Sequence, residues 1–177
     1  MTAGRLWVIV LALALAEGAA PSRSVEVSTS AREGRVFVSC SFQAAETDDL
    51  DEAIHAGLAS SITYEVDLRR PVGWFERTLA SATVTASVQH DTLTGRYQLT
   101  RAVDGRIEET LVSDDLAVTK RFLTQFTRLA LFSTGDLEPN VEYSVRVRVK
   151  TRPQKNWFFW PWDRTTASGT ARFTFIP

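Results

Sequence analysis

The segment from Tyr143 to Lys150 constrains the fold of this chain more than any other stretch, because its side chains alternate strictly in polarity. Its apolar positions are Tyr143, Val145, Val147 and Val149, and its polar positions are Ser144, Arg146, Arg148 and Lys150. A period of two places successive side chains on opposite faces of a β-strand. We therefore predict a half-buried strand with one face in a core and the other in water.

A second alternating segment, Ser61 to Arg70, carries acidic residues on its polar face. Its predicted inward residues are Ile62, Tyr64, Val66 and Leu68, and its outward residues are Thr63, Glu65, Asp67 and Arg69. Opposite charges that face each other across two strands stabilise a sheet by about 0.2 to 1 kcal/mol. We therefore predict that this strand lies beside 143–150, with Glu65 and Asp67 opposite the basic residues.

The remaining elements follow from shorter patterns. We predict strands at 25–29, 35–42, 83–90, 96–103, 106–112 and 171–176, and helices at 46–57 and after Ser113. Pro71 has no backbone donor, so the strand is expected to break at 71–75. Ser113 is expected to cap the second helix, with Asp114 and Asp115 in its first turn. Residues 128–132 fit either a continuation of that helix or a short strand. The strand 171–176 should pair with 143–150 as a long hairpin.

The Leu-x-Pro-x-x-x-Tyr motif that ends at Tyr143 resembles the start of strand F in immunoglobulin-like and fibronectin type III domains. In those domains the tyrosine hydroxyl bonds to nearby backbone and forms a tyrosine corner. Pro139 presets φ for a turn, and Asn140 suits a left-handed conformation. The fold that we predict is mainly β, an antiparallel immunoglobulin-like sandwich with two short helices.

The N-terminus has the pattern of a signal peptide. Arg5 precedes an apolar run at 6–16, and small residues follow it. The run is shorter than the roughly 20 residues of a transmembrane helix, although an uncleaved anchor stays an alternative. We therefore expect a signal peptide at 1–20, a single domain at 21–177 and a periplasmic location.

The composition argues against several classes of function. A net charge of -1 gives no general attraction to nucleic acid. The single cysteine, Cys40, cannot form an internal disulfide and is expected to be a buried apolar residue. His55 and His90 are too few for a histidine metal cluster, and no nucleotide or hydrolase motif is present. We expect no enzyme, no metal and no cofactor.

Several short motifs, taken together, resemble a bacterial family of domains of unknown function, DUF4390. They are the acidic segment that ends at Gly57, the strand 64–71 followed by Trp74 and Phe75, the hairpin 91–97, the helix start at 114–116 and the motif at 137–147. The resemblance covers roughly 25–177. It implies an exported bacterial protein, often encoded beside a two-component sensor kinase, and it supplies no functional residues.

A dense aromatic run lies between the last two predicted strands, where it would form the tip of their hairpin. The candidate contact residues are Lys155, Trp157, Phe158, Phe159, Trp160, Trp162 and Arg164. Each large aromatic side chain has roughly 150 to 250 Å² to bury. The run therefore forms a lid over its own core, an anchor for a protein partner, or a membrane-interface contact.

We expect a binding module of the bacterial envelope, whose partner is an envelope protein, with peripheral membrane contact as a further option. A sensor system is the associated process that the family resemblance suggests. The alternative is a small periplasmic hydrolase or a ligand carrier with a pocket between sheet and helix. Carboxylates that act together in a glycosidase leave no local spacing signal, so this alternative stays open.

Overall fold

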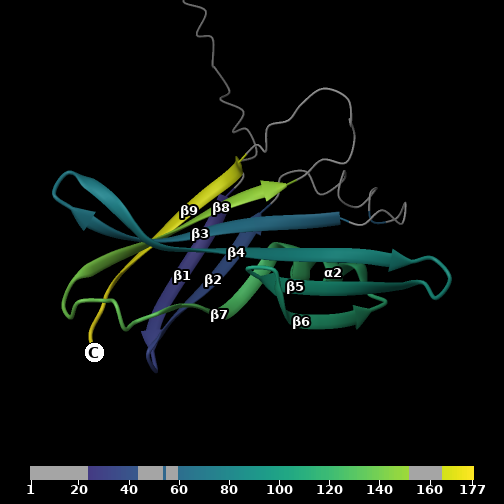
Figure 1. Ribbon diagram of the computed structural model, residues 1–177. Coiled ribbons are helices and arrows are strands. Elements are labelled where there is room, and N and C mark those ends of the chain that lie inside the picture. Colours follow the sequence, from purple (N-terminus) through teal and green to yellow (C-terminus); the bar gives the residue numbers. More distant parts are fainter. Residues whose placement is uncertain (1–23, 44–53, 55–59, 152–164) are drawn as a thin grey trace, which may run out of the picture.

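The computed structural model describes residues 24–43, 54, 60–151 and 165–177, which form two antiparallel sheets and a helix (Figure 1). The three-stranded sheet has the order β1-β2-β7, with β1 (Ser24–Arg32), β2 (Arg35–Gln43) and β7 (Gln125–Ser133). The six-stranded sheet has the order β6-β5-β4-β3-β8-β9, with β3 (Ser60–Val72), β4 (Phe75–Asp91), β5 (Arg96–Val103), β6 (Arg106–Ser113), β8 (Glu142–Thr151) and β9 (Thr165–Thr174). Helix α2 (Leu116–Thr124) precedes β7.

The strand order is that of an immunoglobulin-like sandwich. In such folds strands A, B and E share one sheet, and strands C, F and G share the other. Here β1, β2 and β7 take the first set of positions, and β3, β8 and β9 take the second. The tyrosine corner is present, because the Tyr143 hydroxyl accepts a hydrogen bond of 2.8 Å from the backbone N–H of Glu138. Asn140 has a φ of 59°. The prediction of an antiparallel β-sandwich is therefore confirmed.

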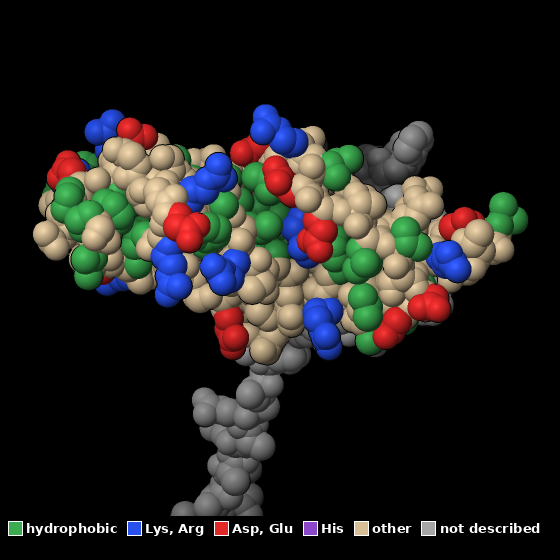
Figure 2. All heavy atoms as spheres, turned by 90° about the horizontal axis from the view of Figure 1, so that it is seen from below, with side chains coloured by type: hydrophobic (Ala, Val, Ile, Leu, Met, Phe, Trp, Pro, Cys, Tyr) green, Lys and Arg blue, Asp and Glu red, His purple; other side chains and the backbone are tan. Residues whose placement is uncertain are grey.

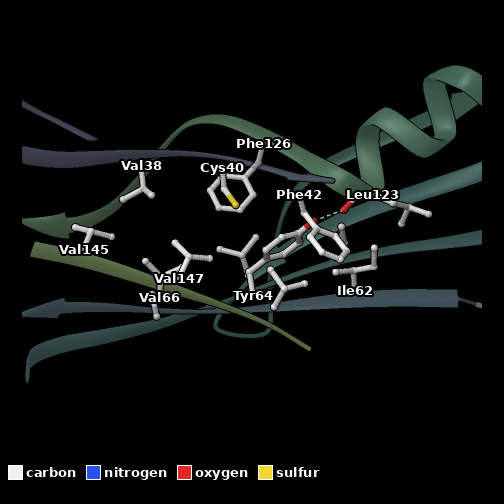
Figure 3. Packing of buried hydrophobic residues seen from close by; sticks show 14 of the residues in the cluster. Val38, Cys40, Phe42, Ile62, Tyr64, Val66, Leu123, Phe126, Val145 and Val147 are labelled. Atoms are coloured by element: carbon white, nitrogen blue, oxygen red, sulfur yellow. Dashed lines mark hydrogen bonds between the residues drawn. The ribbon is translucent and has the colours of Figure 1, made fainter. Parts of the chain in front are cut away.

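The core lies between the two sheets and is built from the alternating faces of β2, β3 and β8 (Figure 3). Tyr64 stands at its centre, where its ring meets the Phe126 ring edge to face at 5.2 Å between centroids. Cys40 is buried in this core as predicted, and desolvation raises the pKa of its thiol to about 12. The thiol is therefore protonated and unreactive at neutral pH.

The predicted pairing of β3 with β8 is confirmed. Glu65 faces Arg148 and Asp67 faces Arg146 in the antiparallel register. Arg148 lies 3.4 Å from Glu65, directly opposite it. The two shorter ion pairs are diagonal, two residues from this register: Arg148 bonds to Asp67 at 2.9 Å and Lys150 bonds to Glu65 at 2.7 Å. The predicted hairpin between β8 and β9 is also confirmed, although β9 begins earlier than expected, at Thr165.

One local prediction, the N-cap of α2, needs correction. The N-cap of α2 is Asp115, not Ser113, because the Asp115 carboxylate accepts from the Ala117 N–H at 2.7 Å. Ser113 still pairs with Tyr97 at the end of β6. The alternative left open at 128–132 resolves to a strand, β7, in which Arg128 has a φ of 53°. The other predicted helix, at 46–57, lies outside the described residues except for Ile54, which is buried.

The C-terminal end of α2 is held by two side chains that sequence patterns did not single out for this task. The Tyr64 hydroxyl donates to the Leu123 carbonyl at 2.6 Å. Arg101 donates to the carbonyls of Phe122 and Gln125 at 2.8 and 2.9 Å, and its guanidinium lies 4.1 Å from the centre of the Phe122 ring. These donors satisfy carbonyls that have no partner within the helix.

The two edge strands of the large sheet are in different surroundings. β9 lies against β1, and a Cβ atom added at Gly169 would be only 2.3 Å from the Val25 carbonyl oxygen. Only glycine permits so close an approach. By contrast, every residue of β6 except Ser113 is exposed, including Ile107 and Val112.

Candidate functional site

The hairpin between β3 and β4 extends beyond the body of the sandwich. The pairing of β3 with β8 ends at Arg69 and Ser144, whereas the pairing with β4 continues to Val72 and Phe75. In Figure 1 this hairpin projects at one end of the molecule, beside the connection from β7 to β8. Its last residues are therefore bordered by a strand on one side only.

The predicted break at 71–75 is wrong, because Pro71 lies within β3 opposite Glu76. A two-residue turn follows Val72, and the positive φ of 62° at Gly73 suits a type II′ turn. In antiparallel pairs the backbone groups of alternate residues point away from the partner strand. Pro71 is one residue from the pair that closes the turn, so its missing donor faces the side that β8 leaves open.

The turn presents three large apolar side chains to solvent. Trp74 is 94% exposed, Phe75 is 48% exposed and Val72 is 40% exposed, and we refer to these three residues as the hairpin tip. The rings of Trp74 and Phe75 meet at 71° with 5.4 Å between centroids. Figure 2 shows apolar side chains gathered at the corresponding end of the molecule. Adjacent exposed aromatic residues are uncommon on a monomer and are typical of contact surfaces.

The stem below the hairpin tip is fixed by ion pairs. Arg69 bonds to Glu76 across the hairpin at 2.6 Å. Arg70 bonds to both carboxylate oxygens of Glu138 at 2.5 and 2.8 Å, which ties the hairpin to the connection before β8. This hydrogen bond lowers the pKa of Glu138 and raises that of Arg70. A bidentate pair fixes orientation as well as distance, so the tip is presented in a defined direction.

The residues that the sequence singled out for partner contact, 155–164, lie outside the described residues. His90 and Asp91 lie at the end of β4, within the described residues. His90 stacks on Tyr97 at 4.7 Å, and Asp91 accepts from the Thr94 hydroxyl at 2.8 Å and from the Leu93 N–H at 2.9 Å. Both hydrogen bonds lower the pKa of Asp91, and the bond from Thr94 makes the largest contribution. The carboxylate is thus engaged in its own loop.

The space between sheet and helix, where the alternative function needs a pocket, holds packed side chains. Thr119, Phe122 and Leu123 of α2 are buried there. Within the described ranges, no three His, Cys, Asp or Glu side chains are grouped so that they could hold a metal ion. The same part of the chain contains no helix with the length and hydropathy needed to cross a membrane.

The hairpin tip was visible in the sequence only as a loop. Gly73 signalled a turn, but the exposure of Trp74 depends on how far β8 extends alongside β3, which no local pattern records. Nothing in the sequence indicated that Leu93, just beyond the other end of β4, would be almost fully exposed.

Comparison with known proteins identifies one family. A family model described as "Domain of unknown function (DUF4390)" matches residues 20–156, and this match confirms the family resemblance. No curated protein and no solved structure matches the chain significantly.

Proposed function

The chain belongs to the DUF4390 family of domains of unknown function, and we propose that it is a binding module that attaches to a protein partner through its hairpin tip. The observation that carries this proposal is the 94% exposure of Trp74 beside a half-exposed Phe75. Aromatic residues of this kind supply much of the binding energy in protein interfaces, where truncation costs about 2 kcal/mol or more.

The rigidity of the stem supports binding over accidental exposure. The tip is held by two ion pairs, one across the hairpin and one to Glu138. A preorganised contact surface loses less conformational entropy when a partner binds. The proposal is therefore one of recognition and not of catalysis.

We place this module in the periplasm of a bacterium. The apolar run at 6–16 after Arg5 supports export. The first partner to test is the extracytoplasmic part of a sensor kinase, because the family resemblance implies that such kinases are encoded nearby. Mass spectrometry of the protein purified from the periplasm should find an N-terminus near residue 21, and a chain that retains residues 1–20 would contradict export with cleavage.

The interaction is tested by site-specific photo-cross-linking in the cell that produces the protein. A photoreactive phenylalanine analogue at Trp74 should give a discrete protein adduct. The same analogue at Leu93 is the matched control, since Leu93 is 96% exposed at the opposite end of β4. Phe75→Ala should lower the yield of the adduct from position 74 without changing the melting temperature.

Two outcomes would overturn the proposal. One is an absence of adducts from position 74, or equal adducts from positions 74 and 93. The other is exclusive cross-linking to lipid, which would indicate a membrane contact. The predicted contact residues Trp157, Trp160 and Trp162 stay a separate prediction, and the analogue at Phe158 tests it in the same experiment.

A further inference from the structure

A shallow polar groove lies on the outer face of the large sheet, on the side of β3, β8 and β9 that faces away from the core. Its volume is about 490 Å³, and it is lined by Arg69, Glu76, Arg146, Ser168, Thr170 and Arg172. The register explains this grouping. Thr170 faces Arg146 across the strands, and Arg172 faces Ser144, which in turn faces Arg69. Arginines from three neighbouring strands therefore meet in two adjacent cross-strand rows.

The ion pairs of this face leave Arg146 without a carboxylate. Asp67 is directly opposite Arg146, but it bonds to Arg148 at 2.9 Å and accepts from the Ser81 hydroxyl at 2.8 Å. Glu65 is taken by Lys150 at 2.7 Å. Arg146 is exposed and forms no ion pair with any other described residue. The carboxylate directly opposite Arg146, that of Asp67, is therefore already paired with another cation.

The remaining charges of the groove add to this excess. Arg172 is 72% exposed, and its contact with Glu142 is long, at 3.8 Å. Glu76 is the one carboxylate in the lining, and it is occupied by Arg69 at 2.6 Å and by the Ser144 hydroxyl at 3.2 Å. Three guanidinium groups thus face one carboxylate, with the hydroxyls of Ser168 and Thr170 beside them as additional donors.

We infer that this groove binds an acidic peptide segment of the protein partner, with carboxylates held by Arg146 and Arg172. Guanidinium groups match carboxylates in geometry and form two parallel hydrogen bonds with each. The groove adjoins the hairpin tip, because Glu76 directly follows Phe75 and lies opposite Pro71. One partner segment can therefore place an apolar group on the tip and acidic residues in the groove.

The inference rests on the proposed function in one respect, namely that the partner is a protein. The test uses unlabelled hexaglutamate and the full chain, with binding followed by isothermal titration calorimetry at low salt. The peptide has no aromatic or aliphatic side chain for the tip, so Trp74→Ala should leave its affinity unchanged. The double variant Arg146→Gln, Arg172→Gln should bind about tenfold more weakly, in line with two partly screened charge contacts.

Arg106→Gln is the matched control, because Arg106 is an exposed arginine on the distant edge strand β6. This variant loses the same kind of charge and should keep the affinity of the wild type within about twofold. Raising the salt concentration should weaken peptide binding to the wild type and hardly change that to the double variant. The melting temperatures of all variants should agree with the wild type, because the three arginines are exposed.

The inference fails if the double variant and Arg106→Gln bind hexaglutamate equally well. It also fails if inorganic phosphate or vesicles of phosphatidylglycerol bind the wild type but not the double variant while hexaglutamate does not bind, because the ligand would then be a phosphate group. Cross-linking from position 74 to a protein, combined with no binding of hexaglutamate, would refute the groove and leave the proposed function intact. Binding of hexaglutamate without such cross-linking would do the opposite.

Discussion

The two halves of the six-stranded sheet differ in what covers them. The half formed by β3, β8 and β9 packs on the small sheet, and the inward residues Val145, Val147 and Val149 are fully buried. The half formed by β4, β5 and β6 packs on α2, a helix of nine residues, and β6 has no buried side chain. One half is thus covered by a second sheet. In the other half the inward residues Val84, Val88 and Leu99 are buried, but only a short helix covers it and the edge strand β6 stays exposed. The same sheet therefore combines a stable region with a lightly covered one.

The largest effect should come from the closed half, at Gly169. Gly169→Val would place a side chain 2.3 Å or less from the backbone of Val25, and backbone atoms cannot move aside easily. We expect a loss of about 3 kcal/mol in the free energy of unfolding, measured by urea denaturation. Ser168→Ala, on the exposed neighbouring residue, should change it by less than about 0.5 kcal/mol. Equal stability of the two variants would show that β1 does not approach β9 so closely.

In the other half, the largest effect should come from Arg101. Arg101→Met removes the donors to the carbonyls of Phe122 and Gln125 while keeping an apolar side chain of similar length. Unsatisfied buried acceptors cost roughly 1 to 3 kcal/mol, so we expect a loss of about 2 kcal/mol. Hydrogen exchange should show faster opening of α2 in this variant than of β8. A uniform increase over both elements would contradict the separate stability of the two halves.

Tyr143→Phe should have a smaller effect in the closed half. It removes the acceptor of the Glu138 N–H at 2.8 Å and leaves the apolar packing unchanged. We expect a loss of about 1 kcal/mol in thermal unfolding. Tyr97→Phe is the matched control, because the Tyr97 hydroxyl has no hydrogen bond to any residue in the described part of the chain, and its loss should be within about 0.5 kcal/mol. Equal effects would mean that the corner is not a stabilising contact.

The smallest effect should be at the open edge. Val112 is 53% exposed on β6, so Val112→Thr should change the free energy of unfolding by less than about 0.5 kcal/mol. The same change at the fully buried Val147 should cost more than 1 kcal/mol, since it also buries a hydroxyl without an assured partner. Similar losses at both sites, in parallel urea titrations, would show that β6 is covered more completely than its exposure indicates.

Much of the fold could be predicted because alternating polarity marks the strands, and opposite charges on two strands indicate that they pair. The alternation at 61–70 and 143–150 fixed the inward faces, and the opposite charges of Glu65 and Lys150 indicated that these strands are neighbours. The tyrosine corner followed from Pro139, Asn140 and Tyr143 within one short motif.

The features that sequence reasoning missed depend on distant parts of the chain. Pro71 is tolerated in β3 because the pairing with β8 stops at Arg69, before it reaches Pro71. Arg101 is tolerated in the interior because α2 supplies carbonyls to it. The candidate site was missed for the same reason. Trp74 is exposed by the length of the hairpin. Among the described residues, Arg146 has no ion-pair partner, because Arg148 takes Asp67. Each of these results from a competition among partners that a single strand does not display.

The contact between β1 and β9 joins the first and last strands of the described chain, and this affects the order in which the fold can form. The strands β1 and β2 can form a hairpin early, because only a short turn separates them. The backbone of Val25 cannot reach its final place against Gly169 until β9, about 140 residues later, is available to fold. Contacts of such long sequence separation slow folding. The seam between β1 and β9 therefore closes only after the strands between them have joined the fold.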